Sequence, residues 1–228
     1  MHLTPYQPVG MVPAVTAPHL SSPAAPRDAR SRFLDTALQV IRAKGYEATT
    51  IDDLCREAGL TKGGFFHHFK SKEALALAAA DHFAAMAARL FASAPYHRHT
   101  DPLDRVLGYL DFRASILRGE LPEYTCLLGT MVQETYTTHP AITAACERHI
   151  SAHAAAVAAD IAEARRLHAP SAPWSAESLS LHFQAVLQGA FILAKARQGP
   201  EIAASCIVHL RRYVELLFAH PSAKEIRP

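Results

Sequence analysis

A short run of residues near position 60 combines small, hydrogen-bonding and positively charged side chains. The run reads Thr61, Lys62, Gly63 and Gly64. Threonine and lysine donate hydrogen bonds to phosphate oxygens, and two glycines inside a helix cost roughly 1 kcal/mol each relative to alanine unless a partner must approach closely. Lys72 follows in the first turn of a later helix, where a positive charge is unfavourable unless an anion faces it. These residues predict a surface that contacts a phosphate backbone.

The pattern around this run predicts two short helices joined by a tight turn. Thr50 can cap a helix over residues 51–58, and Asp53 completes a capping box three residues later. Apolar residues at i, i+3, i+4 and i+7 give that helix one apolar face. Gly59 is a favourable helix stop, and Thr61 caps the second helix. The layout is a helix-turn-helix that presents the N-terminal end of its second helix.

The run TTIDDLCREAGLTKGGFFHHFKSKEAL resembles the DNA-binding domain of the TetR family of bacterial transcriptional regulators. The resemblance covers about residues 27–83, and the spacing, the AG turn, the KG start and the HFKSKEAL ending all agree. One departure is Phe66, where the family usually has a tyrosine whose hydroxyl reaches a phosphate. The resemblance implies that double-stranded DNA is a partner.

The resemblance also implies which residues contact DNA. Residues 61–64 would approach the major groove, while Thr50, His67 and Lys72 would contact phosphates and hold the backbone register. The predicted DNA-binding residues are Thr50, Thr61, Lys62, Gly63, Gly64, Phe66, His67 and Lys72. Basic residues ahead of the first helix either reach the minor groove or backbone, as in the family, or form a solvated flank.

The composition favours a cytoplasmic protein. Of the 228 residues half are hydrophobic, the formal net charge is +2, and residues 27–72 hold nine lysines and arginines against six acidic residues. Four cysteines without close pairing indicate a reducing compartment. No apolar run reaches the ~20 residues of a membrane span, and the N-terminus does not have the pattern of a secretory signal. Neither a glycine-rich phosphate loop nor a G-x-S-x-G or H-E-x-x-H motif is present, so we expect no enzyme.

The sequence pattern predicts an all-α fold of about nine helices, because alternating β-branched runs are absent. Residues 1–26 carry six prolines and no charged side chain, which predicts a disordered tail. We expect a helix-turn-helix DNA-binding domain over 27–87, with the motif at about 50–69, and an effector-binding and dimerisation domain over 88–220. Predicted helices of the second part span about 101–118, 123–138, 140–168, 175–198 and 200–219.

The last two predicted helices are unusually apolar. In the resembled family such helices pair with their symmetry mates as a four-helix interface, whereas an apolar stripe can equally be intramolecular core. One short recognition helix reads too few bases for tight binding, and a dimer reads two half-sites. We therefore expect a homodimer.

The middle helices would enclose a small-molecule pocket in this family. Its predicted lining is apolar and aromatic with a few polar groups, although ordinary core packing is an alternative role for each residue. The candidate residues are Phe83, Met86, Tyr109, Phe112, Met131, Gln133, Glu134, Tyr136, His139 and Phe183. The segment CLLGTMVQETYTTHPAI resembles C-terminal regions of a subgroup of these regulators. Cys126 is either a redox or electrophile sensor or a structural cysteine.

Three potential metal ligands share one helix face. Cys146, His149 and His153 are spaced at i, i+3 and i+7, and thiolate and imidazole suit zinc, copper(I) or nickel. Chance alignment is the alternative, because fourteen histidines are scattered through the chain. We expect neither a metal nor another cofactor.

These features together favour a cytoplasmic, homodimeric, sequence-specific DNA-binding transcriptional regulator. The resemblance favours a repressor that binds an inverted-repeat operator and is released by a small-molecule effector. The alternative is a helical ligand- or metal-binding protein that retains the helix-turn-helix as a scaffold.

Overall fold

The computed structural model describes residues 28–219, and all regular structure in that range is helical. The tail expected over residues 1–26 lies outside this range. The described chain has ten α-helices and one 3₁₀ helix, η1, which confirms the all-α prediction. The helices are α1 Ala29–Lys44, α2 Ile51–Ala58, α3 Lys62–His68, α4 Lys72–Ala92, η1 Pro95–Arg98, α5 Pro102–Ser115, α6 Leu121–Tyr124, α7 Leu127–Thr135, α8 Pro140–His168, α9 Ala176–Arg197 and α10 Glu201–Ala219.

The prediction of a single helix over 123–138 is wrong, because the chain forms two helices there, α6 and α7. Thr125 and Cys126 have extended backbone between the two helices. The buried side chain of Arg42, from α1, donates a hydrogen bond to the carbonyl oxygen of Thr125 at 3.2 Å. This partner lies 83 residues away in sequence, so the local pattern could not reveal the break.

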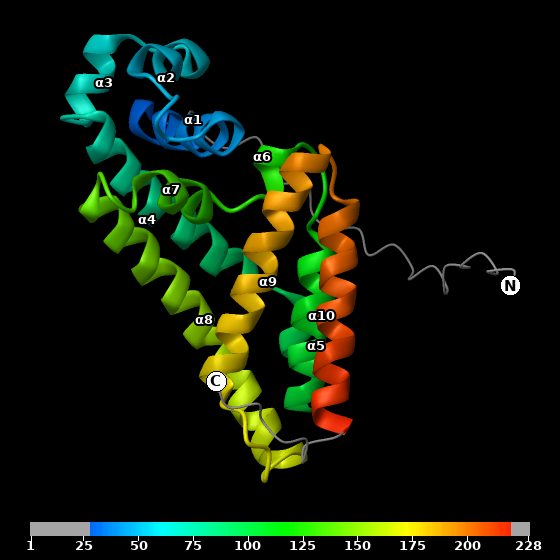
Figure 1. Ribbon diagram of the computed structural model, residues 1–228. Coiled ribbons are helices and arrows are strands. Elements are labelled where there is room, and N and C mark those ends of the chain that lie inside the picture. The colour runs from blue at the N-terminus through cyan, green and yellow to red at the C-terminus, as the bar shows by residue number, and fades with distance from the viewer. Residues whose placement is uncertain (1–27, 220–228) are drawn as a thin grey trace, which may run out of the picture.

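The helices form two parts that pack directly against each other (Figure 1). Helices α1 to α3 gather at one end of the molecule, and α4 leads away from them, while α5, α9 and α10 run side by side. The core around α1 to α4 contains Phe33, which packs edge-on against Phe65 with ring centroids 5.4 Å apart. Buried side chains of α7 and of the start of α8 belong to this same core, among them Met131 and Ile142. The helix-turn-helix is therefore packed directly on the part of the chain that follows residue 87.

The second core lies among α5, the later part of α8, α9 and α10. Its largest fully buried side chains include Leu110, Ile161 and Phe183. Helix α8 contributes to both cores, with Ile142 in the first and Ile161 in the second. This long helix therefore packs into both parts of the molecule.

Helix α4 is rich in alanine. Among the described helices it is the one that, with its extension to Arg98, is long and apolar enough to cross a membrane by length and composition. In the fold it packs against α1, α7 and α8, and it buries Leu75, Ala76, Ala79 and Phe91 in the two cores. These contacts account for part of its apolar character, because 28% of the apolar stretch is buried in the fold.

Candidate functional site

The helix-turn-helix is held by the capping residues that the sequence predicts. The Thr50 hydroxyl accepts a hydrogen bond from the backbone N–H of Asp53 at 3.1 Å, and the Asp53 carboxylate accepts one from the N–H of Thr50. Gly59 ends α2 in the left-handed conformation, with φ of +62°. The Thr61 hydroxyl accepts from the N–H of Gly64 at 3.1 Å and so caps α3. These caps set where α3 begins and which end is presented.

Asp53 also joins α2 to the end of α1. Its carboxylate accepts hydrogen bonds from Lys44 and from Arg56, the latter at 2.7 Å. The bonds from Lys44, Thr50 and Arg56 hold the pKa of Asp53 well below its usual range. The carboxylate therefore stays ionised and fixes the angle between these two helices.

The two glycines of α3 are not required by the fold. A Cβ atom on Gly63 would meet only the Thr61 hydroxyl oxygen, at 3.8 Å, and one on Gly64 would meet the same atom at 3.5 Å. Both distances are ordinary contacts, and neither glycine has a positive φ. The free space in front of them lies outside the protein, where a partner can approach the α3 backbone.

The remaining predicted α3 residues lie on the same exposed face as Gly63. Lys62, Phe66 and His67 are all exposed, and Phe66 has 55% of its surface accessible. The Lys62 ammonium pairs with Asp52 on α2 at 2.8 Å, and both side chains are exposed. A large exposed apolar ring beside a lysine and a histidine suits contact with a surface that has both apolar and anionic groups.

Lys72 lies apart from the α3 group, at the turn between α1 and α2. Its ammonium donates to the carbonyl oxygens of Tyr46 at 3.1 Å and Glu47 at 3.4 Å, and it lies 4.2 Å from the centre of the Tyr46 ring. In the free protein Lys72 therefore holds this turn. Its predicted phosphate contact stays a prediction.

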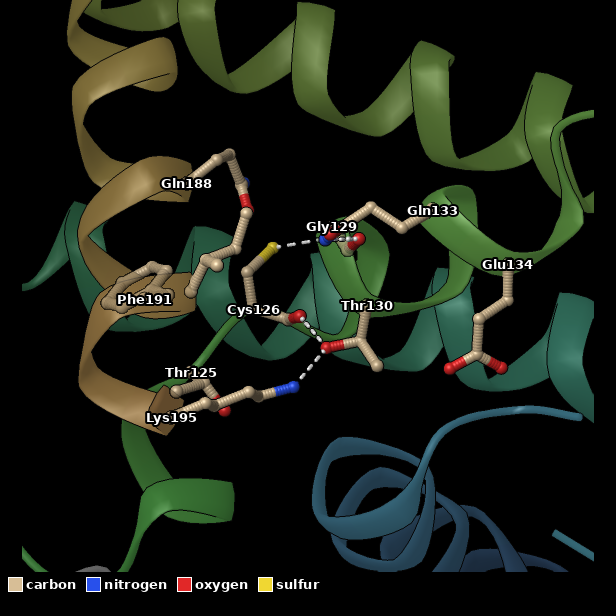
Figure 2. Close-up of a pocket in the computed structure, with 10 residues that line it drawn as sticks. Thr125, Cys126, Gly129, Thr130, Gln133, Glu134, Gln188, Phe191 and Lys195 are labelled. Carbon is tan, nitrogen blue, oxygen red and sulfur yellow. Dashed lines mark hydrogen bonds between the residues drawn. The ribbon is translucent and has the colours of Figure 1, made fainter. Parts of the chain in front are cut away.

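A cavity of about 250 Å³ lies between α7 and α9 (Figure 2). Both hydrogen-bonding groups and apolar side chains line this cavity. The lining residues are Thr125, Cys126, Gly129, Thr130, Gln133, Glu134, Gln188, Phe191, Ile192 and Lys195. Figure 2 shows the Lys195 side chain reaching across from α9 to Thr130 on α7, and its ammonium donates to the Thr130 hydroxyl at 2.8 Å.

The residues predicted to line an effector pocket do not meet at one cavity. Of the ten candidates, Gln133 and Glu134 line the cavity between α7 and α9. Met131 is buried in the first core and Tyr109 and Phe183 in the second, with Phe83 and Met86 packed on the first and Phe112 on the second. Tyr136 is 68% exposed, and His139 stacks edge-on against Tyr46. The apolar candidates belong to two separate cores, and the predicted effector pocket stays a prediction.

Sequence reasoning missed most of the cavity lining. The local pattern predicts a continuous helix through Thr125 and Cys126, and it does not bring Lys195 near them. The sequence contains one indication that Lys195 faces a polar site, because it is a charged residue within the apolar pattern of α9. A lysine at such a position either snorkels to solvent or faces a polar cavity.

Two of the residues that line the cavity form hydrogen bonds with residues of the helix-turn-helix part. Glu134 accepts a hydrogen bond from the backbone N–H of Glu47, in the turn between α1 and α2, at 2.8 Å. Thr125 accepts from Arg42 near the end of α1. Burial lowers the pKa of Arg42 to about 10, so the guanidinium remains charged at neutral pH.

The three potential metal ligands on α8 lie in different surroundings. Cys146 is fully buried, and burial raises the pKa of its thiol to about 12. His149 bonds to Asp81 at 2.7 Å, and His153 bonds to the Tyr109 hydroxyl at 3.0 Å. Between residues 28 and 219, no group of three or more His, Cys, Asp or Glu side chains is arranged to hold a metal ion.

The outer faces of α9 and α10 carry large exposed apolar side chains. The residues are Leu181, Ile192, Leu193, Val208, Tyr213 and Leu216, each between 43% and 59% exposed. A Cβ atom on Gly189, on α9, would meet nothing within 4 Å. Apolar groups gathered on two neighbouring helices are typical of a surface that another protein covers.

Comparison with known protein families covers both parts of the chain. The family model described as "Bacterial regulatory proteins, tetR family" matches residues 33–79, and "Transcriptional regulator LmrA/YxaF-like, C-terminal domain" matches residues 102–202. This chain belongs to the TetR family. The second match includes the CLLGTMVQETYTTHPAI segment and all of the cavity lining.

Curated relatives of this TetR family member match limited stretches of it. The regulator YerO of Bacillus subtilis is 42% identical over 57 residues, which are 25% of this chain and 20% of YerO. The repressor KstR2 of Mycolicibacterium smegmatis is 38% identical over 52 residues, which are 23% of this chain and 25% of KstR2. A Lactococcus lactis regulator is 29% identical over 108 residues, which are 47% of this chain and 55% of that protein. The chain thus spans about half or less of the length of these curated relatives.

Solved structures agree with the fold along most of the chain. A TetR regulator from Chloroflexus aurantiacus is 27% identical, with a TM-score of 0.69 over 82% of this chain and 94% of that one. A TetR-family regulator from Agrobacterium tumefaciens, at 16% identity and a TM-score of 0.72, covers 81% of this chain and 96% of that one. The arrangement of α1 to α10 is therefore that of a TetR regulator.

Proposed function

We propose that this protein is a cytoplasmic transcriptional repressor that binds an inverted-repeat operator as a homodimer and is released by a small-molecule effector. The observation that carries the proposal is the open N-terminal end of α3, where Gly63 and Gly64 leave the helix backbone accessible. The fold does not need glycine there, and glycine disfavours a helix. Close approach of the major-groove edge of DNA accounts for both residues.

The residues of α3 and its surroundings divide into two roles. Thr61, Lys62, Gly63 and Gly64 approach base edges at the start of the recognition helix. Thr50, His67 and Lys72 contact the DNA backbone from different parts of this domain, and the Phe66 ring can pack there but lacks the hydroxyl that would reach a phosphate. Lys62 exchanges its exposed bond to Asp52 for DNA, which costs little because an exposed ion pair contributes only ~0–1 kcal/mol.

The homodimer is formed by α9 and α10. The exposed leucines and the open space at Gly189 support this interface, because helices approach most closely where side chains are small. In a two-fold dimer the same face of each protomer meets its copy. The two α3 helices then read two half-sites, which multiplies the specificity of one short helix.

Release by an effector follows from the bonds between the cavity and the helix-turn-helix part. A ligand that displaces Thr125 or Glu134 also changes the positions of Arg42 and Glu47, which set the orientation of α1 and of the turn after it. A small rotation of each DNA-binding part changes the spacing of the two α3 helices. The size of the effect depends on how much better the ligand binds the released conformation.

Selection of binding sites from random duplex DNA by the purified protein tests this function. At near-physiological salt we expect enrichment of an inverted repeat, whose half-site spacing reports the dimer geometry. Weak, salt-sensitive binding without enrichment would contradict the proposal and favour a ligand-binding protein that keeps the helix-turn-helix as a scaffold.

A further inference from the structure

The cavity between α7 and α9 contains a lysine without a carboxylate partner. The Lys195 ammonium is half-buried and donates one hydrogen bond, to the Thr130 hydroxyl at 2.8 Å. Among residues 28–219 it forms no ion pair. Burial lowers the pKa of Lys195, and the positive charge of Arg42 adds to this effect, while Glu134 opposes it. An ammonium held in this way favours an anion beside it.

A second positive group lies behind the cavity wall. Arg42 is 4% exposed, and its guanidinium donates to the carbonyl oxygens of Leu38 at 2.8 Å and Thr125 at 3.2 Å. Within the described part of the chain it too lacks an ion pair with a carboxylate. Thr125 lines the cavity, so both cations act on the same space. Buried charges without a counter-ion are uncommon because removing them from water is costly.

One carboxylate, that of Glu134, lines the cavity, and it forms no ion pair with the lysine among the described residues. Glu134 accepts the hydrogen bond from the backbone N–H of Glu47 at 2.8 Å. Glu134 thus acts on Lys195 through its charge, which raises the pKa of Lys195, without forming an ion pair with it among the described residues.

The rest of the lining determines what kind of anion fits. Phe191 and Ile192 form an apolar wall on α9, next to Lys195, while Gln133 and Gln188 offer amide groups. A volume of about 250 Å³ is small for a ligand site and suits a molecule with one short apolar body. Ile192 is 48% exposed, which places part of this wall at the surface.

We propose that this cavity binds a small organic carboxylate, whose oxygen accepts a hydrogen bond from the Lys195 ammonium and whose apolar body lies against Phe191 and Ile192. This inference rests on the proposed function in one point, which is that this cavity is the effector site. Binding of the carboxylate adds an ion pair at Lys195, which already donates a hydrogen bond to Thr130 on α7. Thr130 lies between Cys126 and Glu134 on α7, so this contact acts on the segment that bonds to Arg42 and Glu47.

Calorimetric titration of the full chain without DNA tests the carboxylate site. The probes are benzoate, phenylacetate and hexanoate, each compared with its neutral amide at the same ionic strength. We expect at least one carboxylate to bind roughly tenfold or more tightly than its amide, as for a charge-assisted hydrogen bond. Equal binding of acid and amide, or no carboxylate binding at millimolar concentration, would overturn the proposal without any variant.

The variant Lys195→Met keeps the length of the side chain and removes the charge. We expect it to weaken carboxylate binding roughly tenfold or more, whereas Arg197→Met, at an exposed position on the same helix, leaves binding unchanged. If Lys195→Met bound the carboxylates as tightly as the wild type does, the assignment of Lys195 to the anion site would be overturned.

A second readout separates this inference from the proposed function. If carboxylates bind through Lys195 but do not release an enriched operator, the effector role fails and the anion site stands. If an operator is enriched and no carboxylate binds, the regulator stands and the anion site fails.

Discussion

Gly63 couples the stability of the protein to its DNA binding in opposite directions. Because a Cβ atom there meets only the Thr61 hydroxyl oxygen at 3.8 Å, Gly63→Ala should stabilise the fold by about 0.5–1 kcal/mol. The same methyl group occupies the space through which DNA approaches, so operator affinity should fall. Urea unfolding and fluorescence anisotropy measure the two effects.

Gly59→Ala is the matched control for this prediction. Gly59 has φ of +62°, which alanine adopts only with strain, so this variant should lose stability. If Gly63→Ala bound the operator as tightly as the wild type, close approach at Gly63 would be contradicted.

Lys72 should contribute to affinity without contributing to sequence preference. Its ammonium already lies on the carbonyl oxygens of Tyr46 and Glu47, so it can bridge these groups to a phosphate. Lys72→Ala should weaken binding to all sequences similarly and reduce the salt slope by about one. Binding measured across a salt series, on operator and on random DNA, checks this result. A change of base preference at one position would contradict the phosphate role.

The junction of α1 with α2 should respond to acid through Asp53. Because Lys44, Thr50 and Arg56 lower its pKa below the ordinary 3.8, the folded state binds a proton less readily than the unfolded state. The contribution of Asp53 is therefore present above about pH 4 and is lost as the pH falls further. Asp53→Asn should lower stability at neutral pH and flatten the acid side of the stability curve.

Chemical denaturation at a series of pH values measures this effect. Asp104→Asn, at an exposed position in the first turn of α5, is the control. An acid dependence of Asp53→Asn equal to that of the wild type would show that the carboxylate does not hold the junction.

The packing of α5 against α8 should give a separate pH dependence at higher pH. His153 accepts or donates a hydrogen bond with the Tyr109 hydroxyl at 3.0 Å, and burial lowers its pKa from 6.5 to about 4. The unfolded chain takes up this proton first, so stability is full above pH 6.5 and falls between pH 6.5 and 4.

His153→Gln keeps a polar partner for Tyr109 and should remove this pH dependence. The loss in the wild type amounts to about 3 kcal/mol at most, since one pKa unit corresponds to ~1.4 kcal/mol. Thermal unfolding between pH 7 and pH 5 measures the difference, and His149→Gln, at the histidine bonded to Asp81, is the control. An unchanged slope in His153→Gln would contradict a neutral buried imidazole.

At the scale of the whole molecule, the outer faces of α9 and α10 should determine the oligomeric state. Leu181 and Leu216 are 54% and 59% exposed, so replacing both with glutamate should leave the monomer folded and separate the dimer. Light scattering coupled to gel filtration measures the mass. Leu167→Glu, at a 50% exposed leucine on α8, should remain dimeric. If the double variant kept the wild-type mass, these faces would not form the interface.

The sequence by itself determined the helix-turn-helix in detail. The caps and the stop that bound α2 and α3 involve residues only a few positions apart. Thr50 and Asp53 cap α2, Gly59 ends it and Thr61 caps α3, all at their predicted positions. Local hydrogen bonds and backbone preferences act over such short distances, so the pattern of residue types contains the information. The all-α fold followed for the same reason.

The tertiary structure alone decided where the cavity lies and how it is connected to the DNA-binding part. The break between α6 and α7 depends on Arg42, and the position of Glu134 depends on Glu47. Apolar residues that shared a predicted pocket separated into two cores, because a sequence pattern shows which face of a helix is buried but not against which helix. Lys195 gained its role in the same way, since the groups around it come from α7 and α1, far away in the chain.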